Sequence, residues 1–394
     1  MVTTRRTMLR TVAQSGIGLT LAGSLGNAML GSEAHAQAQG AAARSGLVDK
    51  INANTLMILT TGSGLTFGPM AADMATVLND GDNLRILPVQ GYSAFQNVRD
   101  VRYLRGIDMG FTRSNILGHW RRSGEIPDLN DKIVYILKVF NEEENLIVKD
   151  PSITSIEQLR GKKVNFNQVG SGTQMSAQDI FSAFKVPIEE TNLREGDALE
   201  KLKNGEIAGM VATAGKPSPV LRRLKGSEGY HIVPVPLKDA MIGDYFPSTL
   251  EHDDYPDMIP AGQTVDTVAS SAILISYNWP KNSDHYRRVE KFVNAFFPKL
   301  PEFLKPPRHE KWKETVLSAS IPGWKRFDAA EEWLRNDREQ ELNAKRDQFK
   351  EFLASRNSTV DRTKVMTDAD RNQLFEDFMK WMNKGKSTAA VARP

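Results

Sequence analysis

The segment KVNFNQVGSGTQMSAQDIFSAF, residues 163–184, joins a short apolar run to a periodic run through a glycine turn. Lys163-Val164-Asn165-Phe166 is typical of a strand, and the apolar spacing from Gln174 to Phe184 is typical of a helix. Gly170-Ser171-Gly172-Thr173 lies between them, where glycine lets the backbone approach a ligand and expose consecutive N–H groups. The segment therefore predicts a strand, a tight turn and a helix start that can hold an anion.

A second segment of this kind occurs earlier in the chain. Leu56 to Thr60 has the length and composition of a strand, and it runs into the turn GSGLTFGP at residues 62–69. An amphipathic helix is predicted from Met70 to Leu78, with Pro69 in its first turn. One such turn is also explained by ordinary capping. Two of them, one in each of two α/β units, indicate two lobes that hold one small anion between them.

The rest of the chain repeats the alternation of strands and helices. Strands are expected at 85–89, 107–111, 133–140, 146–148, 209–211, 232–235 and 271–275, and helices at 94–105, 155–159 and 198–203. This alternation predicts an α/β fold with a parallel sheet and helices on its faces. We expect lobe one to comprise residues 55–145 and 259–326, lobe two residues 146–258, and a charged helical extension residues 327–394.

The N-terminal residues have the features of an export signal. Thr4 to Arg10 contains a twin arginine, a mildly apolar stretch follows, and Ala34-His35-Ala36 is a cleavage pattern. Residues 1–36 are therefore predicted to be a twin-arginine signal peptide, and residues 37–54 a flexible leader. No later segment reaches the ~20 apolar residues that span a bilayer, so we expect a periplasmic protein that is not embedded in the membrane.

Composition excludes several classes of protein. The 394 residues contain no cysteine, which excludes disulfides, thiolate zinc sites, iron–sulfur clusters and a cysteine nucleophile. The formal net charge is +3, and the signal peptide carries three arginines against one glutamate. The mature chain is thus close to neutral, and we expect no nucleic-acid partner.

Motifs for catalysis or for metal binding do not stand out. The glycine spacing at residues 62–68 departs from the dinucleotide fingerprint, and Ser171 lacks the flanking glycines of a nucleophile elbow. The histidines do not have the spacing of a zinc helix. Acidic runs at Glu251–Asp254 and Glu142–Glu144 are interpreted as solvated loops. We therefore expect a binding protein rather than an enzyme, with no catalytic residue, no cofactor and no metal site.

Short motifs follow one another in an order that resembles a known family. Beside the turns at 62–69 and 170–173, the chain has LRGKKV at 159–164, GYSAFQN at 91–97, TRSN at 112–115, AGKP at 214–217 and IPAG at 259–262. These motifs, between about Leu56 and Trp324, resemble those of the extracytoplasmic solute-binding receptors of TRAP transporters, of the TAXI type. The resemblance implies a two-lobed periplasmic-binding-protein fold of type II with a hinge between the lobes.

The resemblance also implies a function and a set of contacts. Such receptors close on a small carboxylate, such as an amino acid, an oxo acid or a dicarboxylate, and deliver it to the membrane subunits of a secondary transporter. The residues that match the ligand-binding motifs, or lie beside them, are Ser63, Gly64, Thr66, Phe67, Tyr92, Ser93, Asn97, Arg113, Ser114, Asn115, Ser171, Gly172, Thr173, Gly215 and Lys216. Gln96 and Asn115 replace acidic residues of the family, which favours a carboxylate without an α-amino group. An alternative is a sensor of the same fold that serves a membrane signalling partner through its charged extension.

Overall fold

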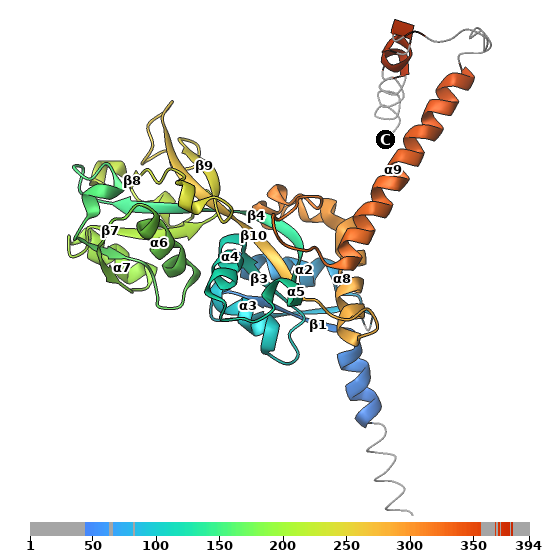
Figure 1. Cartoon of the computed structure of the whole chain (residues 1–394), viewed down its shortest axis with the longest axis horizontal. Coiled ribbons are helices and arrows are strands. Elements are labelled where there is room, and N and C mark those ends of the chain that lie inside the picture. The colour runs from blue at the N-terminus through green and yellow to red at the C-terminus, as the bar shows by residue number, and fades with distance from the viewer. Residues whose placement is uncertain are drawn as a thin grey trace, which may run out of the picture. The chain divides into compact units, whose positions relative to one another are not determined.

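The computed structural model of the chain describes residues 44–62, 66–81, 83–355, 367, 369–370, 372–378 and 380 (Figure 1). The predicted signal peptide lies outside the described residues. The chain divides into two units, which meet between Ala53 and Asn54. In the first unit, residues 44–53 form a helix, although the sequence analysis placed them in a flexible leader. The remainder of the fold belongs to the second unit.

The second unit is built on one mixed sheet. Its described residues form ten strands in the order β2-β1-β3-β10-β4-β7-β5-β6, with β8 beside β4 and β9 beside β10. The strands are β1 (Thr55–Thr60), β2 (Arg85–Gln90), β3 (Met109–Arg113), β4 (Ile133–Val148), β5 (Lys163–Asn165), β6 (Glu189–Thr191), β7 (Gly209–Ala214), β8 (His231–Val233), β9 (Phe246–Glu251) and β10 (Thr264–Tyr277). The α/β class predicted from the sequence is confirmed.

The sheet is mixed, so the prediction of a parallel sheet is wrong. β1 pairs in parallel with β2 and β3, and β5 pairs in parallel with β6 and β7. β10 is antiparallel to β3 and β4, and β4 is antiparallel to β7. The two long strands carry the chain from one half of the sheet to the other and back, so they cannot share the direction of all their neighbours.

The first crossing strand is longer than predicted. Two strands were expected at 133–140 and 146–148, and β4 is instead a single strand of 16 residues. Its first part pairs with β10, and Glu143 to Val148 pair with β7. β10 likewise extends beyond the predicted 271–275. The residues between the two predicted strands stay extended because each pairs with a neighbouring strand, β10 up to Glu143 and β7 from Glu143 onward.

The helices cover both halves of the sheet. They are α2 (Phe67–Leu78), α3 (Ala94–Tyr103), α4 (Ser114–Ser123), α5 (Leu129–Lys132), α6 (Gly172–Ala183), α7 (Glu195–Lys203), α8 (Asp284–Phe303) and α9 (Asp328–Ser355), with a 3₁₀ helix η5 (Glu310–Glu314) after α8. Ser93, Ser171 and Ser283 cap α3, α6 and α8, each accepting the N–H of the third residue that follows. The cap at Ser171 explains why α6 begins at Gly172 rather than at the predicted Gln174.

Buried side chains form one large core and two smaller ones. The large core takes most of its residues from 56–140 and 272–334, and the smaller cores take theirs from 146–268. Phe67 stacks on Phe111 at 4.9 Å in the large core and also contacts Phe140. The large core therefore needs both early and late segments of the chain.

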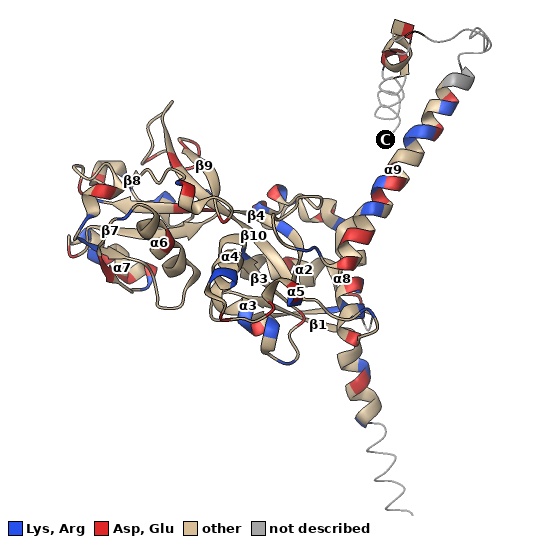
Figure 2. Ribbon diagram, in the orientation of Figure 1, with Lys and Arg blue, Asp and Glu red and all other residues tan. Residues whose placement is uncertain are grey.

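The part of the predicted C-terminal extension that the structure describes is largely helical. Phe327, Ala330 and Leu334 are buried in the large core at the start of α9. Farther along, Leu342 is 50% exposed, and positive and negative side chains alternate along α9 (Figure 2). Within the described part of the chain, none of the helices combines the length and the apolar character that crossing a bilayer requires.

Candidate functional site

Three strand-to-helix turns meet at the carboxyl ends of β2, β3 and β5. Tyr92 and Ser93 lie in the turn before α3, and each donates a hydrogen bond to the turn before α6. The Tyr92 hydroxyl donates to the carbonyl of Val169 at 2.8 Å, and the Ser93 hydroxyl donates to that of Gly170 at 2.8 Å. Thus the turns of the two halves, both predicted from the sequence as ligand contacts, touch each other directly.

Arg113 ends β3 and lies against the start of α6. Its side chain is 2% exposed, and a Cβ atom added to Gly172 would meet its Nη2 at 2.4 Å. Glycine at this position thus leaves the space that the guanidinium occupies. The first N–H groups of a helix carry partial positive charge, so the start of α6 adds hydrogen-bond donors beside the buried guanidinium of Arg113.

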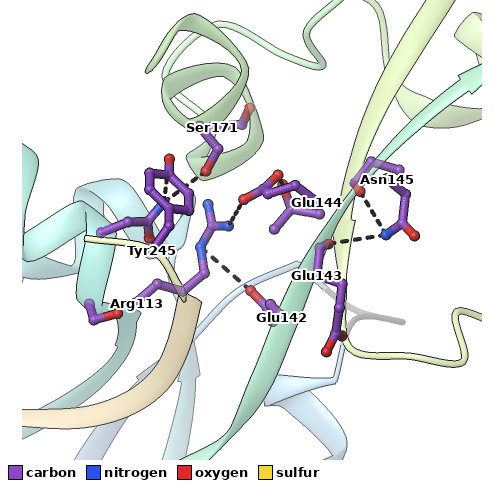
Figure 3. A network of polar contacts seen from close by, with 12 residues as sticks. Arg113, Glu142, Glu143, Glu144, Asn145, Ser171 and Tyr245 are labelled. Carbon is purple, nitrogen blue, oxygen red and sulfur yellow. Dashed lines mark hydrogen bonds and ion pairs between the residues drawn. The ribbon is translucent and has the colours of Figure 1, made fainter. Parts of the chain in front are cut away.

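Two carboxylates of β4 neutralise Arg113. Arg113 Nη1 donates to Glu144 Oε1 at 3.2 Å, and Arg113 Nε lies 3.5 Å from Glu142 Oε2 (Figure 3). Successive side chains of a strand point to opposite faces, so Glu142 and Glu144 share the side of Arg113, and Glu143 points away from it. The prediction that this acidic run is a solvated loop is wrong. It lies inside a paired strand, and two of its three carboxylates, Glu142 and Glu144, have a buried arginine as counter-ion.

Burial changes the proton affinity of these carboxylates. Removal from water disfavours the charged form and raises the pKa of Glu142 to about 7, although Arg113 opposes the shift. Burial also raises the pKa of Glu144, again against Arg113 and against a hydrogen bond from Thr213. The carboxyl of Glu142 is therefore partly protonated near neutral pH.

A polar chain extends the site toward α6. Asn115 Nδ2 donates to Ser176 Oγ at 2.9 Å and to the Tyr245 hydroxyl at 3.0 Å. Asn115 is fully buried, and its Oδ1 has no hydrogen-bond partner among the described residues. Burial strongly raises the pKa of Tyr245, whose hydroxyl therefore stays protonated. These hydrogen-bonded side chains thus place a buried amide oxygen and hydroxyl groups beside Arg113 and Glu144.

Several predicted residues hold the framework of this site. Asn97 Nδ2 donates to the carbonyls of Thr60 and Phe111 and so ties the ends of β1 and β3 together. Ser114 Oγ accepts the N–H of Ser271 in β10. Phe67 belongs to the large core, Thr66 precedes α2, and Thr173 lies half-buried in the first turn of α6. Ser63 and Gly64 lie outside the described residues.

Gly215 and Lys216 lie on the other side of β4. The Lys216 backbone N–H donates to Glu143 Oε2 at 2.9 Å, and its Nζ donates to the carbonyl of Thr249 at 2.7 Å. Gly215 packs against Lys311, whose Nζ donates to the carbonyl of Lys216 at 2.5 Å. The structure therefore does not bring these two residues together with Arg113, and their role as ligand contacts stays a prediction.

Sequence reasoning missed four residues of the site: Glu142, Glu144, Ser176 and Tyr245. A signal for Ser176 was present, since residues four apart share one face of a helix and Ser176 follows Gly172 by four positions. Tyr245 carried no comparable local signal. Among the residues that the structure describes, groups of His, Asp or Glu suited to holding a metal ion are absent.

Replacing Gly172 by alanine tests the packing of Arg113. The added methyl group takes the space of Nη2, so the guanidinium must leave the start of α6, and we expect affinity for the carboxylates proposed below to weaken about tenfold. Gly196→Ala is the matched control, because Gly196 also lies in the first turn of a helix and a Cβ there meets open space. Isothermal titration of both variants with the carboxylates of the ligand panel below measures their dissociation constants. Equal dissociation constants in the two variants would contradict the expected displacement of the Arg113 guanidinium.

Comparison with known proteins places the chain in a family. Solved structures similar to it include the periplasmic aliphatic sulphonate binding protein SsuA from Escherichia coli, at 18% identity, covering 63% of this chain and 70% of that chain with a TM-score of 0.36. A histidine-bound substrate binding protein of an ABC uptake transporter from Streptococcus pneumoniae matches at 14% identity, over 65% and 91% of the two chains, with a TM-score of 0.40. XAC2383 from Xanthomonas citri, bound to ATP, matches at 11% identity over 66% and 89%, with a TM-score of 0.41. The model of the NMT1-like family matches residues 58–314, which is more than half of the sequence, and the chain belongs to the NMT1-like family.

Proposed function

We propose that the chain is an exported solute-binding receptor that captures a small carboxylate and delivers it to a TRAP-type secondary transporter. The observation that carries the proposal is the buried guanidinium of Arg113 against the start of α6, where three strand-to-helix turns meet. A planar guanidinium binds carboxylates through two parallel hydrogen bonds, and the helix start adds N–H donors. The resemblance to TAXI receptors supports the same ligand class and the same partner.

In this proposal the ligand lies between two lobes with the boundaries predicted from the sequence. Arg113, Ser114 and Asn115 contact it from lobe one, and Ser171, Gly172 and Thr173 contact it from lobe two. The polar contacts between the turns at Tyr92–Ser93 and Val169–Gly170 hold the lobes together around it. Opening requires bending of β4 and β10, the two strands that join the halves of the sheet.

Binding rather than catalysis fits the chemistry of this site. Arg113 and Glu144 are held by each other, and Tyr245 keeps its proton because burial raises its pKa. An enzyme usually has a base within reach of a nucleophile. Arg113, Glu144 and Tyr245 serve instead as fixed hydrogen-bond donors and acceptors. The predicted twin-arginine signal supports a periplasmic location for the receptor.

A ligand panel tests the proposed function. The purified mature protein is titrated with L-glutamate, 2-oxoglutarate, succinate and butyrate, and with methanesulfonate for comparison. A ligand at 100 times its dissociation constant stabilises the folded state by about 2.7 kcal/mol, which a thermal shift detects readily. We expect at least one carboxylate to bind. Stabilisation by methanesulfonate alone, or by none of the panel, would overturn the carboxylate assignment.

A further inference from the structure

The two carboxylates that neutralise Arg113 are held very differently. Glu144 is 1% exposed, receives a hydrogen bond from Arg113 and accepts another from the Thr213 hydroxyl at 2.6 Å. Glu142 is 13% exposed, and among the described residues Arg113, at 3.5 Å, is its one ion-pair or hydrogen-bond partner. Glu142 is therefore the carboxylate that can leave Arg113 at small cost.

The position of Glu142 is the position that an incoming carboxylate needs. Glu142 lies at Nε of Arg113, and Nη2 on the same edge of the guanidinium faces the start of α6. Nε and Nη2 form a two-donor fork, and a carboxylate bound there also faces the N–H groups of α6. Glu144 occupies Nη1, away from this edge.

We propose that Glu142 occupies the carboxylate position on Arg113 and yields it to the ligand, taking up one proton from solvent as it leaves. This inference rests on the proposed function and adds a specificity-determining residue to it. The exchange is balanced: the ligand carboxylate replaces the Glu142 carboxylate on Arg113, and the displaced Glu142 becomes neutral. The net charge at Arg113 is the same before and after binding.

The surroundings of Glu142 favour protonation once it leaves Arg113. The charged groups that act on it are Arg113 from the end of β3, Lys311 from η5, and Glu143 and Glu144 from β4 itself. Lys311 Nζ is engaged by Glu314 and by the carbonyl of Lys216, on the side of Glu143. Glu142 itself pairs with Ser270 of β10, and β7, which pairs with β4 from Glu143 onward, has only uncharged side chains. When Glu142 loses its ion pair with Arg113, the charged groups of β4 beside it are Glu143 and Glu144, which carry the same charge and favour its protonation.

The sign of the pH dependence follows from the proton uptake. The pKa of Glu142 is about 7 while it pairs with Arg113, and loss of that pairing raises its pKa further. Binding that takes up a proton is strongest at low pH and weakens as pH rises through the pKa of the free protein. We expect affinity to fall about tenfold between pH 6 and pH 8, and to level off below about pH 6.

Calorimetry in two buffers measures the uptake directly. The full-length mature protein is titrated with each of L-glutamate, 2-oxoglutarate, succinate and butyrate near pH 8, in phosphate and in Tris, whose protonation enthalpies differ. The difference in heat gives the protons taken up, and we expect close to one per carboxylate bound near pH 8 and close to zero near pH 6. This measurement needs no variant, so it does not depend on how a mutant folds.

Two variants assign the proton. In Glu142→Gln the uptake disappears, and the affinity near pH 8 rises to that of the unaltered protein near pH 6, because glutamine mimics the neutral acid. Glu143→Gln is the matched control, since Glu143 is buried one residue away on the other side of β4, and it retains the uptake. Carboxylate binding without uptake, or uptake that persists in Glu142→Gln, would overturn the inference and leave the proposed function standing. Absence of carboxylate binding throughout would overturn both.

Discussion

Replacing Arg113 by glutamine should weaken carboxylate binding severely and lower the free energy of unfolding by about 3–5 kcal/mol near pH 8. The substitution removes the counter-ion of Glu142 and Glu144, which then face each other inside the sheet. Removing one partner of a buried ion pair leaves an uncompensated charge, and this accounts for most of the loss. Ligand affinity falls by about 30-fold or more, because the guanidinium fork has gone.

The loss of stability in Arg113→Gln depends on pH in a defined direction. Burial raises the pKa of Glu142 and Glu144 in the folded state above their values in the unfolded chain. The folded state then binds more protons than the unfolded state, so stability falls as pH rises from the unfolded toward the folded pKa values. Urea denaturation near pH 5 and near pH 8 should therefore show the smaller loss near pH 5.

Arg122→Gln is the control for this variant. Arg122 also pairs with two acidic residues, Asp179 and Asp244, but its side chain is 51% exposed. Exposed ion pairs contribute little, so we expect a loss below about 1 kcal/mol. Similar losses in the two variants would contradict the assignment of Arg113 as a buried counter-ion.

Replacing Trp312 by alanine lowers the free energy of unfolding by about 3–5 kcal/mol. Trp312 in η5 is fully buried, and its ring contacts Phe296 at 5.4 Å and Phe303 at 4.9 Å. Its Nε1 donates to Asp73 Oδ2 at 3.0 Å, so the substitution removes a hydrogen bond as well as a large apolar surface. Chemical denaturation followed by circular dichroism measures the loss.

Trp333→Ala is the control for Trp312→Ala, because it removes the same residue type from a less buried position. Trp333, in α9, is only partly buried and meets Phe297 edge-on at 5.2 Å. We expect a clearly smaller loss than for Trp312, because less apolar surface returns to water. Equal losses in the two variants would show that η5 does not anchor the large core as the structure indicates.

The local elements of the fold were predictable because their signals lie within a few residues. A strand-like run, two glycines and the apolar spacing of a helix predict the turn at 170–173 and the helix after it. The structure has this turn, and Ser171 caps α6 by accepting the N–H of Gln174. The same holds for β1, β2 and α3. These signals need no partner from elsewhere in the chain.

The site itself was only partly predictable because its charges are paired over long sequence distances. Glu142, Glu143 and Glu144 in a row suggest a solvated loop, since three adjacent charges break the pattern of a strand. Their burial depends on Arg113, on β7 and on β10, which the sequence does not place beside them. Arg113 was named as a candidate, but nothing near it in the sequence indicated which carboxylates neutralise it.

Because β4 and β10 both run from one half of the sheet to the other, they affect the order in which the two halves fold. The smaller cores draw on residues 146–268, a continuous stretch, so they can form as soon as that stretch has been synthesised. The large core must wait, because β3 pairs with β10 and Arg113 lies opposite Ala272. Closing so long a loop is entropically expensive and slow. During refolding, amides of the middle segment should therefore gain protection from hydrogen exchange before those of β1 and β3, although β1 and β3 come first in the chain.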